Sequence, residues 1–153
     1  KLDRFLAYYP VTVVLPIPYT KWLIWIDEET GELTDKRKSP KKGNAYEAFR
    51  ELYKIKPYLK EDRLTIKLLF LDMEEYRLLN GWSQDKKKGS CRYDRIPTQI
   101  VDEITLSCPQ DYMQLLPENL PDSFTCSDFA KLVKIPSKRA NVVLNILHYL
   151  EKN

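Results

Sequence analysis

Acidic side chains stand at the ends of two apolar segments that have the composition of β-strands. Asp27 closes the segment KWLIWID, and Asp72 follows the segment LTIKLLFL. Carboxylate oxygens are the ligands that Mg²⁺ prefers, and strand ends are where sheets of α/β proteins place their sites. We therefore take Asp27 and Asp72 as candidate metal ligands, with Glu32 of the acidic segment DEETGE as a third. The structural alternative is a solvated acidic hairpin tip for Asp27 and Glu32, and a strand-end cap or a salt bridge for Asp72.

The elements that would position these carboxylates are predicted from apolar patterning. Residues 11–18 form a β-branched strand closed by prolines, and residues 21–27 form a second strand with a buried centre. Gly31 suits the left-handed position of a hairpin turn, so residues 32–37 are expected to return as a third strand.

The middle of the chain alternates helix and strand. Apolar spacing predicts a helix over 45–59 and a central strand over 64–71. Residues 73–82 are expected to be a short helix or a strand extension, and residues 82–98 a polar, basic loop. Residues 99–107 form one more candidate strand, followed by a helical turn and linker.

With residues 1–9 as the tail of a helix, the order helix, strand, strand, strand, helix, strand resembles the core of the restriction-endonuclease-like fold, the PD-(D/E)XK nucleases. The resemblance covers roughly residues 1–72 and is one of topology. It implies an aspartate ending the second strand, a carboxylate-x-lysine pair on the third, and a lysine that orients or activates the attacking water.

The family pattern transfers to this chain only in part. It makes Asp27, Asp35 and Lys36 the candidate catalytic residues. Side chains two apart share one face of a strand, and the residue two after Asp35 is Arg37, which stays protonated and is a poor base. The lysine on the same strand face as Glu32 is Lys36, which lies four residues later and not two. The site is therefore either rearranged or a degenerate scaffold that no longer cuts.

The last thirty residues predict two helices joined by a tight turn. Thr125 and Asp128 form a capping box, Ile135-Pro136 breaks the first helix, and Ser137 can cap the second, whose apolar stripe includes Val143. This is a helix-turn-helix pattern, which often places its second helix in the DNA major groove. Lys138, Arg139 and Asn141 would then face phosphates and base edges. The alternative is a protein-interaction or dimer module.

Basic residues gather in three segments of a chain whose net charge is only +3. Residues 34–43, 85–95 and 126–153 each carry five lysines or arginines and at most two acidic residues. Such clusters could follow the phosphates of a polyanion, although solvated lysine loops are the alternative. With the helix-turn-helix, they make the following residues candidates for nucleic-acid binding: Lys36, Arg37, Lys38, Lys41, Lys42, Lys86, Lys87, Lys88, Arg92, Arg95, Lys138, Arg139 and Asn141.

Other features exclude or weaken several classes of protein. The three cysteines are widely spaced, which argues against a zinc knuckle or a disulfide framework and favours a cytoplasmic protein. No apolar run approaches the length of a membrane span, so we expect no membrane partner. The single histidine, His148, and the absence of glycine-rich phosphate motifs argue against hydrolase triads and nucleotide-binding loops. Because the chain begins at Lys1 and stops where a wing could follow, we expect a fragment of a longer protein.

The strings WIDEETGE, RKSPKKG, EEYRLLNGWS, KKGS, YDRIPT and FTCSDFAK resemble an uncharacterised family of bacterial proteins, chiefly from Gram-positive anaerobes. The resemblance spans the chain and implies that residues 36–43 and 82–97 are working surfaces.

We therefore predict an α/β (α+β) fold, with a small mixed sheet and flanking helices in restriction-endonuclease-like order over residues 1–108. A helix-turn-helix, or a truncated winged helix, would follow over 111–153. The favoured function is nucleic-acid binding, with duplex DNA as the favoured partner and a homodimer left open. One alternative is a Mg²⁺-dependent nuclease using Asp27, Glu32 or Asp35, and Asp72 with Lys36. Another is a protein-interaction adaptor.

Overall fold

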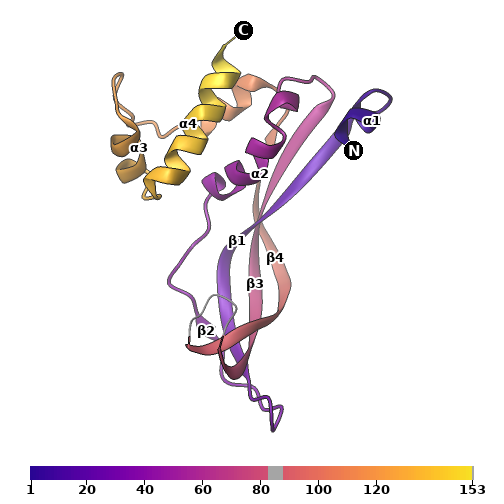
Figure 1. Ribbon diagram of the computed structural model, residues 1–153, viewed down its shortest axis with the longest axis vertical. Coiled ribbons are helices and arrows are strands. Elements are labelled where there is room, and N and C mark those ends of the chain that lie inside the picture. Colours follow the sequence, from indigo (N-terminus) through magenta and orange to yellow (C-terminus); the bar gives the residue numbers. More distant parts are fainter. Residues whose placement is uncertain (83–87, 153) are drawn as a thin grey trace. The chain divides into compact units, whose positions relative to one another are not determined.

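The computed structural model describes residues 1–82 and 88–152, and the side chains outside 80–90. It has the mixed α+β composition that the sequence predicts. In chain order the elements are α1 (Leu2–Leu6), β1 (Val11–Ile26), β2 (Arg37–Lys38), η1 (Ala45–Ala48), α2 (Phe49–Lys54), η2 (Lys56–Tyr58), β3 (Leu64–Trp82), β4 (Lys88–Leu106), η3 (Pro109–Leu115), α3 (Cys126–Leu132) and α4 (Ser137–Glu151), where η denotes a 3₁₀ helix (Figure 1).

The four strands form one mixed sheet in the order β2-β1-β3-β4. Strands β1 and β2 are antiparallel, with Trp22 opposite Lys38 and Leu23 opposite Arg37. The amide of Val11 donates to the carbonyl oxygen of Arg63 at 2.8 Å, so β1 and β3 begin side by side and run the same way (Figure 1). The predicted mixed sheet with flanking helices is confirmed.

Strand β1 corrects the prediction of two strands over 11–18 and 21–27, because one strand runs through Pro16 and Pro18 to Ile26. Proline is compatible with extended backbone, and in sheets it occurs at edges, where no ladder donor is needed. Strand β2 pairs with β1 at Trp22 and Leu23, so the proline segment lies beyond that ladder. One strand fewer therefore precedes the helix than the restriction-endonuclease-like order requires.

The predicted third strand is also shorter than expected. Gly31 has a φ of 73°, as the hairpin turn requires, and its amide donates to the carbonyl oxygen of Asp27 at 2.8 Å. Beyond the turn only an isolated bridge between Ile26 and Leu33 precedes β2. The turn is confirmed, whereas the regular strand over 32–37 is wrong.

Strands β3 and β4 overturn the predicted loop over 82–98. Strand β3 continues to Trp82, and β4 already begins at Lys88. Residues 92–94 and 96–103 of β4 are exposed, so their composition resembled a loop, but pairing with β3 supplies the strand conformation. Pro97 is tolerated because β4 is an edge strand.

The chain forms two compact units that are interleaved in sequence. Unit 1 contains Lys1–Leu15, Ala45–Leu68 and Ile104–Asn153, and unit 2 contains Pro16–Asn44 and Leu69–Glu103. Strands β1, β3 and β4 each contribute to both. Whether the chain divides into domains between residues 108 and 111 stays a prediction.

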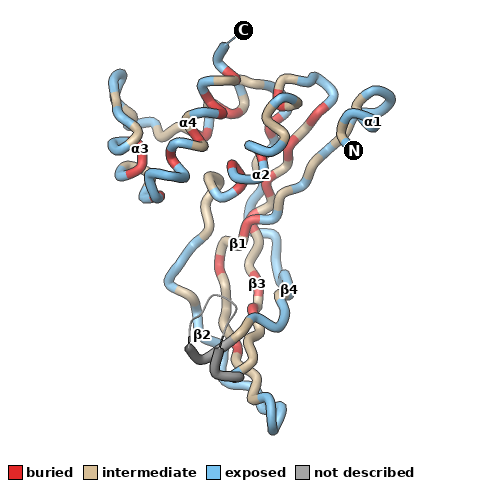
Figure 2. Tube along the Cα trace, in the orientation of Figure 1, coloured by how far each residue is buried: buried red, intermediate tan, exposed pale blue. Residues whose placement is uncertain are grey.

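The core of unit 1 contains buried residues of α2, the start of β3, η3, α3 and α4, and Figure 2 shows buried positions recurring along α4. Phe49, Ile66, Phe129, Val143 and Ile146 have no exposed surface. The aromatic rings of Tyr46 and Phe129 meet edge to face at 5.8 Å. Burial of these large apolar side chains supplies the main stabilisation of unit 1.

In unit 2 the buried face of β3 changes sides. Even-numbered residues are buried up to Phe70, whereas beyond it Met73 and Glu75 are buried. Since alternate residues of a strand point to opposite faces, Asp72 lies on the face that is no longer the core. Asp72 and Phe70 are two residues apart and so point to the same side of β3, but Asp72 does not project into a continuous apolar core.

Candidate nucleic-acid interface

Helices α3 and α4 form the two-helix unit that the sequence predicted. At the start of α3, the amide of Asp128 donates to Thr125 Oγ1 at 3.2 Å, and the amide of Thr125 donates to Asp128 Oδ2 at 2.9 Å. The Thr125 hydroxyl and amide hold the pKa of Asp128 below its usual value. The predicted capping box is confirmed.

The turn between the helices is short and tightly bonded. Lys134 takes a left-handed φ of 55°, and the amide of Ile135 donates to the carbonyl oxygen of Ala130 at 3.0 Å. Pro136 then starts α4, and the helices pack through buried residues that include Phe129 and Val143. The break at Ile135-Pro136 is confirmed.

The start of α4 has no side-chain cap. Pro136 is the N-cap residue in place of the predicted Ser137, which is the first helical residue. The N-cap position requires extended backbone, which proline favours at its φ of −61° and ψ of 143°. The first amides of a helix have no intrahelical acceptor, and no acidic residue occupies the first turn. The positive end of the helix dipole is therefore open to an external anion.

Three cations surround this helix end. A groove of about 460 Å³ is lined by Arg50 of α2, by Pro136, and by Lys138, Arg139 and Val142 of α4. No carboxylate side chain is among these lining residues of the described chain. Lys138, Arg139 and Asn141 are all exposed, as the sequence required of a binding helix. We call this feature the basic groove.

The other side of α4 is used internally. Lys56 Nζ donates to Asn145 Oδ1 at 2.6 Å and lies 4.8 Å from the centre of the Tyr149 ring. Asn145 is therefore held by η2 and is less free for a ligand than Asn141.

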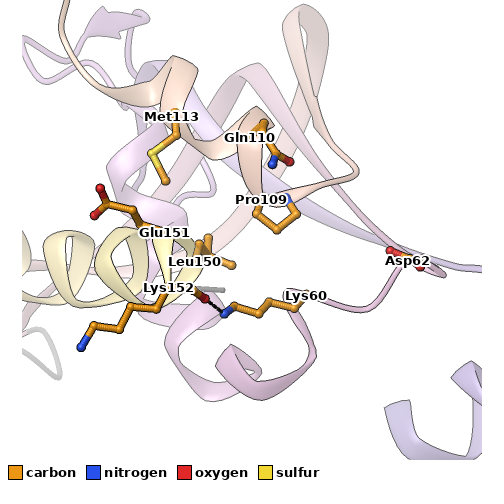
Figure 3. Close-up of a pocket in the computed structure, with 8 residues that line it drawn as sticks. All are labelled: Lys60, Asp62, Pro109, Gln110, Met113, Leu150, Glu151 and Lys152. Atoms are coloured by element: carbon orange, nitrogen blue, oxygen red, sulfur yellow. Dashed lines mark hydrogen bonds between the residues drawn. The ribbon is translucent and has the colours of Figure 1, made fainter.

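A separate cavity at the end of α4 has balanced charge. It measures about 500 Å³, and Lys60 Nζ reaches across it to donate to the carbonyl oxygen of Lys152 (Figure 3). Asp62 and Glu151 offset Lys60 and Lys152, so this cavity has no charge preference for a polyanion.

In unit 2 the basic segment 36–43 lies along β1. The amide of Ser39 donates to the carbonyl oxygen of Lys21 at 2.8 Å, and the amide of Gly43 donates to the carbonyl oxygen of Tyr19 at 3.1 Å. Lys38 lies 5.7 Å from the Trp22 ring centre and Lys42 lies 5.1 Å from that of Tyr19. These cation–π contacts hold two of the predicted cations.

The remaining predicted cations of unit 2 differ in their surroundings. Arg37 and Lys41 are exposed, whereas Lys36 forms an ion pair with Glu74. Lys86 and Lys87, and the side chain of Lys88, lie outside the described residues. Arg92 and Arg95 approach the buried Glu75 on the β3–β4 hairpin.

The candidate carboxylates do not all gather at one place. Asp27 Oδ1 accepts hydrogen bonds from the amides of Thr30 and Glu29 at 3.0 and 2.9 Å, and these bonds lower the pKa of Asp27. Asp27 thus stabilises its own turn. Glu32 and Asp35 are exposed in the same hairpin region. In the described part of the chain, no group of three or more histidine, cysteine or carboxylate side chains is placed to hold a metal ion. The metal and catalytic assignments stay predictions.

Asp72 and Lys36 line the same open depression, which measures about 450 Å³. Glu74, Trp22, Thr98 and Gln99 complete its lining. Asp72 Oδ1 is buried without a hydrogen-bond partner in the described residues. The hydrogen bond to Glu74 raises the pKa of Lys36, so this lysine stays protonated and acts as a cation, not as a base.

Sequence reasoning missed Lys21, Glu75 and Arg77. The Glu75-x-Arg77 spacing on a strand was the available signal, because side chains two apart share a face. The signal does not decide by itself, because the sequence of residues 73–82 is compatible with a helix as well as with a strand.

Residues 1–107 match the model of a family described as "Domain of unknown function (DUF8091)". The chain belongs to this family. The DUF8091 match runs from α1 to the end of β4, so it contains all of unit 2, whereas α3 and α4 lie beyond it.

A protein of Treponema pallidum (strain Nichols), described as an uncharacterized protein, is 27% identical over 139 residues. The match covers 86% of this chain and 52% of the relative, so the chain spans about half the length of this curated relative. No solved structure gives a significant match. No helix in the described part of the chain is long and apolar enough to cross a membrane.

Proposed function

We propose that this protein binds nucleic acid, with duplex DNA as the favoured partner, through α3 and α4 acting as a helix-turn-helix. The observation that carries the proposal is the basic groove, where Arg50, Lys138 and Arg139 surround the uncapped start of α4. Uncapped amides, the helix dipole and clustered cations together favour a phosphate at this position.

The exposed residues of α4 divide naturally into two roles. Lys138, a point charge, suits a phosphate oxygen. Arg139 and Asn141 carry planar groups that can bond the edges of guanine and adenine. Docking the start of the second helix against DNA is the geometry of helix-turn-helix proteins.

The basic segment of unit 2 adds phosphate contacts in this proposal. Arg37 and Lys41 are exposed, and Lys38 and Lys42 are held against aromatic rings. Such contacts raise affinity for any sequence and do not specify one.

A binding experiment with matched variants tests the proposal. Fluorescence anisotropy of a labelled duplex is measured with the full chain and with Arg139→Ala, which we expect to bind more weakly. The control is Arg4→Ala, which removes one exposed guanidinium of unit 1 that does not line the groove. Equal effects of both substitutions would contradict the role of the basic groove, and a stable homodimer that binds no nucleic acid would favour the adaptor alternative.

A second candidate function, Mg²⁺-dependent phosphodiester cleavage, is favoured by the depression that contains Asp72, Glu74 and Lys36. Mg²⁺ is commonly held by one or two carboxylates together with substrate phosphates, and the unpartnered Asp72 Oδ1 fits that role. When bound, the ion would polarise the phosphoryl oxygen, and the protonated Lys36 would attract the phosphate. Nicking of supercoiled plasmid that needs Mg²⁺ and is lost in Asp72→Asn, but not in Asp35→Asn, is the test.

A further inference from the structure

A buried carboxylate in unit 2 organises three arginines of the β3–β4 hairpin. Glu75 has no exposed surface. Arg77 donates to Glu75 Oε1 through Nε at 2.8 Å and through Nη2 at 2.5 Å, and Arg95 Nε donates to Oε2 at 2.8 Å. Arg92 Nε lies 3.6 Å from the same Oε2. The three guanidinium groups therefore converge on one carboxylate. We call this set the arginine cluster.

The positive charges of the arginine cluster exceed its single negative charge. Lys21 adds a fourth cation within electrostatic range of Glu75 and all three arginines. Burial lowers the pKa of Lys21, and repulsion by the arginines lowers it further, against the opposing effect of Glu75. Counted over these five side chains, the net charge is positive even with Glu75 ionised.

Two of the arginines are enough to satisfy Glu75. Arg77 and Arg95 bond both of its oxygens. A purely structural role thus accounts for Arg77 and Arg95, but it leaves the approach of Arg92 and Lys21 without an explanation. Like charges brought together at a partly dry surface repel one another.

The cluster remains open to a ligand. The side chains of Arg77, Arg95 and Arg92 are 32%, 33% and 54% exposed, respectively. Each guanidinium has several N–H donors, and Glu75 takes only two from Arg77 and one from Arg95. Among the described residues, Glu75 is the one carboxylate that these guanidinium groups approach, which leaves donors for a second acceptor with a negative charge.

We propose that Arg77, Arg92 and Arg95, together with Lys21, bind a phosphate group, and that the buried Glu75 holds the guanidinium groups in position for it. The planar fork of arginine matches two oxygens of a phosphate. Fixing the side chains in advance reduces the entropy lost on binding. The phosphate could belong to a polynucleotide, in which case the inference rests on the proposed function, or to a free phosphate compound, in which case it does not.

The test uses pyrophosphate as the probe and Arg92→Ala as the main variant. Arg92 is the arginine least involved with Glu75, so its removal leaves the bonds from Arg77 and Arg95 intact. Calorimetric titration of the full chain should show pyrophosphate binding that falls at least about tenfold in Arg92→Ala, at an unchanged thermal midpoint; about tenfold corresponds to 1.4 kcal/mol. Arg4→Ala, a matched control that removes one exposed guanidinium of unit 1, should bind like wild type. Arg92→Lys, which keeps the charge and loses the fork, should recover only part of the affinity.

Absence of pyrophosphate binding, or equal binding by wild type and Arg92→Ala, overturns the inference and leaves the cluster a partner of Glu75 alone. A duplex-binding measurement on the same variants separates the two proposals. Duplex binding lost in Arg139→Ala, with no Arg92-dependent pyrophosphate site, removes the inference and keeps the proposed function. Arg92-dependent pyrophosphate binding without duplex binding keeps the inference and removes the proposed function. If Arg92→Ala weakens both, the phosphate belongs to a polynucleotide.

Discussion

The backbone of Gly43 passes so close to Pro18 that a Cβ added at Gly43 would lie 2.1 Å from the Pro18 carbonyl oxygen. This approach brings the basic segment onto β1, where the Gly43 amide bonds Tyr19. Gly43→Ala must therefore move the segment away from the strand. We expect a loss of about 1–3 kcal/mol in the free energy of unfolding, measured by urea denaturation, and weaker duplex binding.

Gly31 gives the matched comparison. A Cβ there would meet no atom within 4 Å, and only its φ of 73° is unfavourable for other residues. Gly31→Ala should cost about 1 kcal/mol, and Gly31→Asn less, because asparagine tolerates this conformation. If Gly43→Ala proves as mild as Gly31→Asn, the close approach to Pro18 is not a constraint in solution.

Acid should weaken unit 2 through Glu75. Burial acts to raise the pKa of this carboxyl, but hydrogen bonds from Arg77 and Arg95 and the charges of those two arginines outweigh it and hold the pKa below its usual value. A lowered folded-state pKa contributes stability above the unfolded-state pKa of about 4.3, and this stability is lost as the pH falls through the folded-state pKa.

We therefore expect Glu75→Gln to be destabilised at pH 7 by about 1–3 kcal/mol, since it leaves the arginines without a counter-charge, although their partial exposure moderates the cost. The difference between wild type and Glu75→Gln should shrink toward pH 3 in denaturation experiments. A difference that stays constant from pH 7 to that acid limit would show that the charge of Glu75 is not the source of the stability.

Loss of the capping box at the start of α3 should lower the stability of the protein modestly. Thr125→Ala removes the acceptor for the Asp128 amide and should cost about 1 kcal/mol. Ser127→Ala, at an exposed position within α3, is the matched control and should be nearly neutral. Circular dichroism during thermal unfolding provides the measurement, and identical midpoints for the two variants would contradict the role of the cap.

Local chemistry predicted part of this structure. The Thr125–Asp128 box, the break at Ile135-Pro136 and the Gly31 turn all depend on neighbours within a few residues, and each is confirmed. The cap by Ser137 was wrong because Pro136 takes the extended N-cap conformation itself.

Features that depend on distant pairing were not predictable from the sequence. Strand β4 contains polar, exposed residues whose conformation comes from pairing with β3. Lys36 bonds Glu74, which lies 38 positions away in the sequence. Arg95 bonds Glu75 because the pairing of β3 with β4 brings them together. Asp27 has the carboxylate that a metal site needs, but this carboxylate accepts hydrogen bonds from the amides of the turn that Asp27 begins.

The most direct test of nucleic-acid binding is the salt dependence of duplex affinity for the full chain, for Arg139→Ala and for Arg4→Ala. In a plot of log affinity against log salt concentration, each neutralised phosphate adds about 0.9 to the magnitude of the negative slope. The three cations of the basic groove predict a slope of at least about 2 in magnitude for wild type, reduced by about 1 in Arg139→Ala and unchanged in Arg4→Ala. Binding that is absent or insensitive to salt between about 50 and 200 mM, or a slope that Arg139→Ala leaves unchanged, would contradict the account.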